Sequence, residues 1–240
     1  MISSIRRFAW LGALALIVSP IAGSAQAKPP APTPFVGDSH PLEFGVLAQG
    51  GVGLTEDRNS FKFLMFGGRA GKVLISNVGP GLLHGNFEYG IEVFPFWQSY
   101  TPKFQREMCT DSGCSAPYTV GGTFTGVSIT PIQLRWNFTG SGHRKIVPFV
   151  QGGGGVIWTN HKYPAFGGPP YNTTNDGTAA NTSVWNFTPQ FGVGAHYFVR
   201  PHQSLDIGAN AIHISSSSLG DKNPGVNASV QFSIGYSWWK

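Results

Sequence analysis

The chain has 240 residues, of which 41% are hydrophobic, 13% are aromatic and only 11% are charged, and 33 are glycine. A soluble domain carries about 25% charged residues and about 7% glycine, and a helical membrane protein needs apolar runs of about 18 residues or more. The composition therefore argues against both classes, and also against a disordered chain or a coiled coil. The formal net charge is +5, or +3 without Arg6 and Arg7 of the leader described next, and this weak excess predicts no nucleic-acid partner.

The first 27 residues have the organisation of a secretory signal peptide. Two arginines precede an apolar stretch over residues 8–18, and Ala25 and Ala27 form a small-x-small cleavage site. A retained membrane anchor is the alternative, but the apolar stretch is short for a membrane helix. We therefore predict a signal peptide over residues 1–27 and export of the rest of the chain.

The remaining chain divides into a short leader and one domain. Residues 28–40 are rich in proline, which predicts an extended segment rather than a folded unit. Within residues 41–240, eight segments rich in β-branched and aromatic residues are separated by clusters of Gly, Pro, Asn and Ser. In chain order, the predicted strands cover residues 43–54, 61–76, 87–97, 123–137, 146–159, 184–199, 204–215 and 226–238. Each is long enough to cross a bilayer as a tilted strand.

The last predicted strand shows the alternation most clearly. Large apolar residues such as Phe232 and Ile234 lie on one face, and small or polar residues such as Asn227 and Gln231 lie on the other. The seventh strand alternates in the same way around Ile207. A large apolar face beside a polar face is typical of a membrane barrel, with lipid outside and a polar lumen inside, although a soluble sandwich would alternate similarly.

The lengths of the connections favour the barrel. Long connections over residues 98–122 and 161–183 alternate with short ones over residues 138–145 and 200–203, as in outer-membrane barrels, which have short periplasmic turns and longer outer loops. We therefore predict an all-β fold, an eight-stranded antiparallel transmembrane β-barrel of the bacterial outer membrane, with every long loop outside. Aromatic residues near strand ends are candidates for interfacial girdles: Phe94, Phe96, Trp97, Trp136, Trp158, Trp185, Tyr236, Trp238 and Trp239.

The two cysteines lie close together in one of the long connections. Thr-Asp-Ser-Gly separates Cys109 from Cys114, and in an exported protein such a pair predicts a small local disulfide. A metal site would need further ligands nearby, and none is predicted.

A candidate catalytic pair stands at the end of the seventh strand. His213 and Ser215 are two residues apart, so they project from the same face of a strand, which by the alternation is the lipid-facing one. A hydroxyl beside an imidazole is what nucleophilic acyl transfer requires. The alternative is a polar cap, in which both side chains simply meet lipid headgroups.

The stretch from residue 211 to 227 resembles the C-terminal signature of the outer-membrane lipid A 3-O-deacylases (PagL-type, often called acyloxyacyl hydrolases), in which a His-x-Ser-Asn stretch precedes an Asn, a Gly and an acidic residue. This resemblance implies a barrel whose site faces the outer leaflet, with Ser215 as nucleophile and His213 as general base. It also implies lipid A of lipopolysaccharide as substrate, hydrolysis of the ester-linked 3-hydroxyacyl chain at position 3, and no cofactor.

Two residues depart from that family pattern. Ser216 stands where the family has Asn, and Asn227 stands where it has the acidic residue. Asn227 is then the candidate third catalytic residue, with Asp221 as the alternative. Backbone N–H groups near Ser216, with the side chain of Asn223, are candidates to stabilise an oxyanion.

A second function from another class stays open. A non-catalytic small barrel with a structural or adhesion role through its long outer loops would need neither His213 nor Ser215. The sequence also leaves open whether the barrel is a monomer or a homo-oligomer.

Overall fold

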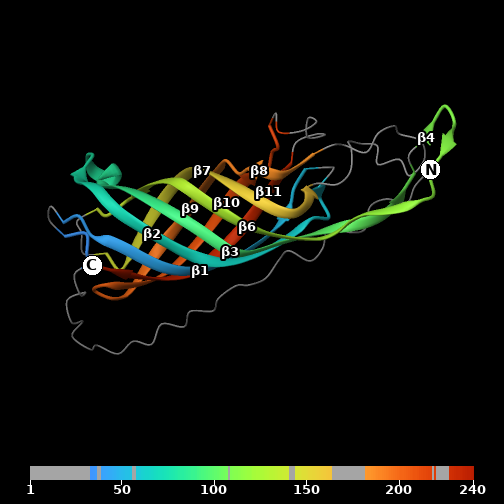
Figure 1. The fold of residues 1–240 in the computed structure, drawn as a ribbon. Coiled ribbons are helices and arrows are strands. Elements are labelled where there is room, and N and C mark those ends of the chain that lie inside the picture. Colours follow the sequence, from blue (N-terminus) through green and yellow to red (C-terminus); the bar gives the residue numbers. More distant parts are fainter. Residues whose placement is uncertain are drawn as a thin grey trace, which may run out of the picture.

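A closed antiparallel β-barrel forms the body of the protein (Figure 1). The computed structural model describes residues 33–36, 39–55, 58–107, 109–140, 144–163, 182–217, 219 and 227–240. The predicted signal peptide therefore lies outside the described residues. The barrel strands are β1 (Leu42–Gly53), β2 (Lys62–Val78), β3 (Gly85–Arg106), β6 (Tyr118–Asn137), β7 (Ile146–Tyr163), β8 (Ser183–Phe187), β9 (Gln190–Arg200), β10 (Gln203–His213) and β11 (Ala228–Trp239).

The barrel has eight strands because β8 and β9 together form one of them. Val156 pairs with Phe187 and Gly153 pairs with Gln190, so the register against β7 is the same on both sides of the break. The break falls at Pro189, which has no N–H to donate to the ladder. With β1 paired to β11 and β6 paired to β7, the ring closes. The prediction of an eight-stranded antiparallel barrel is confirmed.

Side chains alternate between the two surfaces of the barrel as predicted. On β11, Phe232 is 65% exposed and its neighbour Gln231 is 1% exposed, and on β10 the exposed Ile207 stands between the less exposed Asp206 and Gly208. Exposed Val, Ile, Leu and Phe side chains cover the outside of the strands, which is the lipid-facing surface of a membrane barrel. Among the described residues, no helix is both long and apolar enough to span a membrane.

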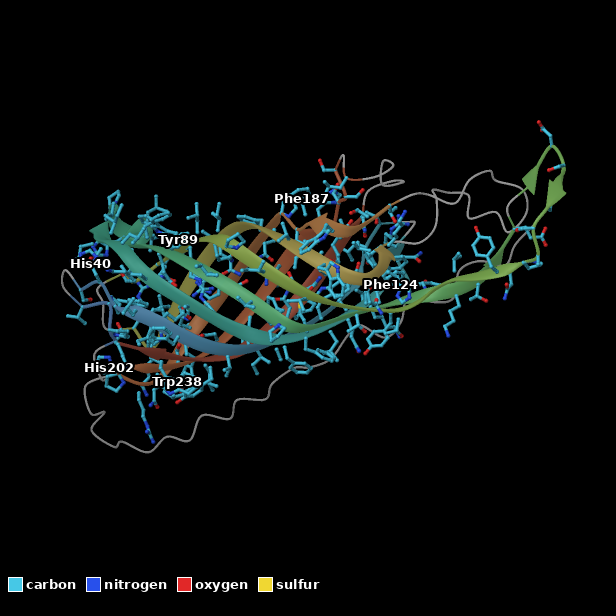
Figure 2. All side chains as sticks on the ribbon, viewed as in Figure 1. His40, Tyr89, Phe124, Phe187, His202 and Trp238 are labelled. Carbon is cyan, nitrogen blue, oxygen red and sulfur yellow. The ribbon has the colours of Figure 1, made fainter. Side chains whose placement is uncertain are left out.

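The two ends of the barrel differ. Strands β2 and β3, β6 and β7, and β9 and β10 are joined at one end, where the 3-10 helix η2 (Gly81–Leu83) and the C-terminus also lie. We call this the short-turn end. The β3–β6 connection and the ends of β7 and β10 lie at the opposite, long-loop end. Figure 2 shows His40, His202 and Trp238 at the short-turn end and Phe187 and Phe124 toward the long-loop end.

Side chains fill the middle of the barrel with a buried ion-pair network. Arg69 contacts Glu43, Glu88 and Glu92 at 2.6, 2.9 and 3.1 Å, and Arg135 contacts Glu43 at 3.1 Å. Buried charges are stabilised only when such partners surround them. Toward the long-loop end the interior becomes an apolar cluster, with these members: Phe61, Phe63, Met65, Phe94, Trp97, Val120, Phe124, Ile157, Tyr163, Ile212 and Ile214.

The segment before the first strand closes the other end of the interior. Phe35 is 4% exposed, and its ring lies 4.9 Å from that of Trp239 and 5.5 Å from that of Phe198, edge to face in both cases. Thr33 is buried beside it, whereas Val36 is exposed. Part of the segment predicted as an extended leader over residues 28–40 is therefore a stopper in the short-turn mouth of the barrel.

The structure corrects the prediction of a long loop over residues 98–122. Here β3 and β6 stay paired as far as Arg106 and Tyr118, and the hairpin projects well beyond the barrel (Figure 1). A bulge at Pro102 and Lys103 interrupts the ladder, and Gly121, which stands opposite, has a φ of +83°. A Cβ at Gly121 would lie 1.9 Å from the Pro102 carbonyl oxygen, so only glycine fits.

At the tip of this hairpin, the short strands β4 (Cys109–Thr110) and β5 (Gly113–Cys114) pair so that the two cysteines stand opposite each other. Cys114 is disulfide-bonded, and Cys109 is the one other cysteine of the sequence. The predicted long connection over residues 161–183 lies mostly outside the described residues.

Candidate functional site

The predicted pair stands where β10 leaves the barrel at the long-loop end. His213 is the last residue of β10, and its N–H donates to the Pro189 carbonyl at 3.0 Å. Ser215 forms an isolated bridge with Phe187, with backbone hydrogen bonds of 2.7 and 3.0 Å in the two directions. The ladder thus continues two residues beyond β10. Both side chains are partly exposed and share the outward face of Ile207 and Ala211, as the alternation predicted.

The position along the strand sets the depth of Ser215 in the membrane. Leu205 lies near the short-turn end, where it pairs with two aromatic residues, the half-buried Tyr236 and the exposed Tyr197. Ser215 lies ten residues farther along, about 33 Å of strand, which is about 25 Å of height at a tilt of about 40°. The apolar band of such barrels is about 25 Å tall, so this estimate places Ser215 near the edge of the band at the long-loop end.

Exposed aromatic side chains at the same level support this depth. Trp185 pairs with Trp158 in the β7–β8 ladder, one outward position beyond Phe187, and all three are exposed. Tryptophan is enriched at membrane–water interfaces, because its ring is apolar and its N–H is polar. Ser215 therefore lies just below an interfacial aromatic pair, at the depth where headgroups join acyl chains.

The imidazole of His213 is held by a backbone group. Its Nδ1 lies 3.2 Å from the carbonyl oxygen of Asn227, which also accepts the N–H of Ile214 at 3.0 Å. A carbonyl oxygen accepts only, so Nδ1 carries the proton of the neutral ring and Nε2 is left with a lone pair. That is the tautomer in which a histidine can take a proton from a serine hydroxyl.

The side chain of Asn227 points away from this contact. It is 1% exposed, on the lumen face, and its Nδ2 has no hydrogen-bond partner among the described residues. Asn227 therefore meets His213 through its carbonyl and not through its carboxamide. Asp221 and Asn223, the other candidates near Ser215, lie outside the described residues.

Ser217 brings a backbone donor to the nucleophile. Its φ is +52°, uncommon for a residue other than glycine, and the resulting turn lets the Ser217 N–H donate to Oγ of Ser215 at 3.2 Å. Ser216 is buried, so its side chain lies on the opposite face from Ser215. The Ser216 hydroxyl therefore does not reach the outer face, and among the described residues the Ser217 N–H is the donor next to Ser215.

Among the described residues, one group has a spacing that suits a metal ion: single ligand atoms of Glu43, His196 and Asp206 lie within 4.8 Å of one another. Its surroundings do not suit a cation. Nη1 of Arg135 lies 3.1 Å from Glu43 and 3.2 Å from Nε2 of His196, and Nδ1 of His196 lies 2.6 Å from Asp206. The guanidinium already supplies the positive charge, so this group belongs to the buried ion-pair network.

Sequence reasoning missed the neighbours of the pair on adjacent strands. Phe187 stands beside Ser215, while Pro189 and Ala228 stand on either side of His213. These contacts depend on the register between strands, which the spacing within one strand does not reveal.

Comparisons with known proteins identify a family and several similar solved structures. A family model described as lipid A 3-O-deacylase (PagL) matches residues 84–237. Among solved structures, the chain is similar to the outer membrane enzyme PagL, with 16% identity, 81% of this chain and 98% of that chain covered, and a TM-score of 0.40. It is also similar to Neisserial surface protein A (12% identity, 82% and 96% covered, TM-score 0.44) and to the N-terminal barrel of Pseudomonas aeruginosa OprF (12%, 82% and 97%, 0.37). No curated protein matches the sequence.

Proposed function

Since this chain belongs to the lipid A 3-O-deacylase (PagL) family, whose model spans β3 to β11 and both residues of the pair, we propose that it hydrolyses the ester of the 3-hydroxyacyl chain at position 3 of lipid A with Ser215 and His213. The substrate is lipopolysaccharide of the outer leaflet. The observation that carries the proposal is the pair itself, outward-facing at the depth of lipid ester bonds, with Nδ1 of His213 on the Asn227 carbonyl.

The contacts of the pair suit nucleophilic acyl transfer. Nε2 of His213 takes the proton of Ser215 as Oγ attacks the ester carbonyl, and a tetrahedral intermediate forms. The Asn227 carbonyl keeps the ring in the required tautomer and offers partial negative charge to the imidazolium. The intermediate collapses to an acyl-enzyme, with the sugar hydroxyl leaving after receiving the proton from His213. Water, activated by the same histidine, then releases the fatty acid.

A backbone amide is the candidate oxyanion donor. The Ser217 N–H, 3.2 Å from Oγ of Ser215 in the resting site, is close enough to donate to the negative oxygen once Oγ is bonded to the carbonyl carbon. Preorganised donors of this kind contribute roughly 10²–10³ to turnover in serine hydrolases. The left-handed turn at Ser217 is what orients this group.

Mass spectrometry of lipid A from cells that express the protein tests the proposal. The wild type should remove one 3-hydroxyacyl chain, and Ser215→Ala should leave lipid A intact. Ser60→Ala, which changes an exposed serine in the β1–β2 connection, is the matched control and should behave as the wild type. Intact lipid A with the correctly inserted wild type would contradict the proposal.

The projecting β3–β6 hairpin favours the second candidate, a barrel with an adhesion role. The same experiment separates the two functions. Adhesion that survives Ser215→Ala, in cells whose lipid A the wild type never alters, would support the non-catalytic function.

A further inference from the structure

Exposed basic side chains follow the short-turn rim of the barrel, at the end opposite the catalytic pair. They belong to strands that are neighbours in the sheet, and all of them are exposed: Lys72 on β2, Arg144 and Lys145 before β7, Arg200 at the end of β9, and Lys240 after β11. We call these five residues the cationic arc.

Three members of the cationic arc gather where β7 meets β9. Arg144 and Lys145 precede β7, and the carbonyl of Lys145 accepts the N–H of Phe198 at 2.8 Å. Arg200 stands two residues beyond Phe198 on β9. Neighbouring strands lie about 4.8 Å apart, so these three cations share one segment of the rim.

The other two members flank the first strand. Leu42 exchanges backbone hydrogen bonds of 2.7 and 2.9 Å with Lys240 and pairs with Lys72 on its other side, so Lys72 and Lys240 lie on strands about 10 Å apart. Gln203 pairs with Arg200 and, on its other side, with β11. The cationic arc is therefore continuous along the rim from β7 to β2.

No exposed carboxylate side chain accompanies these cations among the described residues of the short-turn end. Glu43, Glu88 and Asp206 lie at this end, but they face the lumen and pair there with the arginines and the histidine of the buried ion-pair network. The exposed Asp111 lies at the tip of the projecting hairpin, at the opposite end. The short-turn rim thus presents a positively charged surface.

Aromatic side chains lie on the membrane side of the cationic arc. Tyr197 and Trp238 are 45% and 43% exposed, and the rings of Trp238 and Tyr236 are 4.9 Å apart. Figure 2 shows Trp238 beside His202 at this end. Tyrosine and tryptophan concentrate at membrane–water interfaces, so these residues mark the level at which the hydrocarbon core ends.

The cationic arc stands just beyond that level. Arg200 follows Tyr197 by three residues, which is about 10 Å of strand, or about 8 Å of height at a tilt of about 40°. The headgroup layer extends about 5–8 Å beyond the hydrocarbon core on each side of a bilayer. The basic side chains therefore reach the depth at which lipid phosphate groups lie.

We propose that the cationic arc binds the phosphate groups of anionic phospholipids in the periplasmic leaflet. The choice of leaflet rests on the proposed function, which places Ser215 in the outer one. A lysine packs its aliphatic stem on apolar neighbours while its ammonium group reaches the headgroups, and Lys72 has such neighbours in Leu42 and Tyr89. A soluble polyanion would need the charges but not the aromatic belt beside them, so the arrangement favours a lipid surface.

Native mass spectrometry of the purified protein tests this proposal by measuring which lipids stay bound. The probe is an equal mixture of dioleoylphosphatidylglycerol and dioleoylphosphatidylcholine in detergent, two lipids with the same acyl chains and different headgroup charge. The test variant combines Lys72→Gln, Lys145→Gln and Arg200→Gln. The matched control combines Lys62→Gln, Lys103→Gln and Lys162→Gln, at three exposed lysines of the long-loop end. Heat-modifiable gel mobility confirms that each barrel is folded.

The wild type should retain phosphatidylglycerol over phosphatidylcholine by about fivefold, which corresponds to about 1 kcal/mol for a basic side chain at an anionic lipid surface. The test variant should lose this preference, the control variant should keep it, and added salt should weaken it in the wild type.

Equal preferences in the wild type and the test variant, or an equal loss in the control variant, would overturn the proposal. A preference that soluble glycerol 3-phosphate abolishes at constant ionic strength would assign the arc to a free phosphate ester and overturn the lipid surface. These measurements involve no ester hydrolysis, so their failure leaves the proposed function intact, and lipid A left intact by the wild type would contradict that function without affecting the lipid preference.

Discussion

Replacement of Asn227 separates two ways of holding the catalytic histidine. In the structure the carbonyl of Asn227 accepts Nδ1–H of His213 at 3.2 Å, and the carboxamide is buried in the lumen. Asn227→Ala keeps the carbonyl and removes only a side chain whose Nδ2 has no partner among the described residues. If the carboxamide were the orienting group, its loss would be comparable to disabling the third member of a serine triad, which costs about 10⁴ in turnover.

We therefore expect Asn227→Ala to retain turnover within about fivefold of the wild type, which corresponds to about 1 kcal/mol in the barrier. Asn227→Glu restores the acidic residue type of the family pattern, but on the lumen face. An unpaired carboxylate there costs several kcal/mol, so this variant should fold in lower yield and unfold at lower urea concentration, with no gain in rate.

Single-turnover hydrolysis of a chromogenic ester, with the fraction of folded barrel measured by heat-modifiable gel mobility, provides the assay. Rates are divided by the folded fraction, so that a loss of stability is not taken for a loss of catalysis. A loss above about a hundredfold in folded Asn227→Ala, or a faster acylation in Asn227→Glu, would refute the carbonyl account and assign the orienting role to the side chain.

Two further predictions concern parts of the chain away from the catalytic pair. Phe35→Ala should lower the free energy of unfolding by about 3 kcal/mol, since it empties an aromatic site between Trp239 and Phe198. Val36→Ala, at an exposed neighbour, is the control and should change the free energy of unfolding little. Equal urea midpoints for the two variants would show that the stopper is not packed. The double replacement of Cys109 and Cys114 by serine should leave the rate of ester hydrolysis within about twofold of the wild type, because β4 and β5 lie at the tip of the projecting hairpin. A large loss of turnover in an inserted barrel would show that the tip contacts the substrate.

The barrel was predictable because membrane and lumen impose opposite chemistry on alternate residues. The same parity decides which aromatic residues face lipid. Trp238 is exposed and Trp239 is buried, as neighbours on a strand must be, so naming both as girdle residues was inconsistent with the period of two. Phe94 and Trp97 are likewise buried in the interior cluster rather than in a girdle.

The sequence did not predict the projecting hairpin, because the residues at its bulge are also typical of a loop. Pro102 and Gly121 are ordinary signals of a loop, but here they stand opposite each other in one bulge, and the ladder resumes beyond them at Phe104 and Val120. A bulge is a property of two strands at once, so neither segment alone identifies it.

The site was predictable as far as side chains on one strand define it. His213 and Ser215 share a face because they are two residues apart, and both are partly exposed on the outer surface of the barrel. The partner of His213 was not predictable in the same way. It is a backbone carbonyl, which every residue possesses, and only the β10–β11 register brings that of Asn227 into reach.

The stopper at Phe35 has a consequence for the order in which the barrel assembles. Its partners Trp239 and Phe198 lie near the far end of the chain, and the seam between β1 and β11 pairs Glu43 with Trp239. Contacts so distant in sequence form late, because the entropy of closing the loop between them must be overcome first. The aromatic site of Phe35 is complete only when both Phe198 and Trp239 are in place, so its burial reports completion of the barrel.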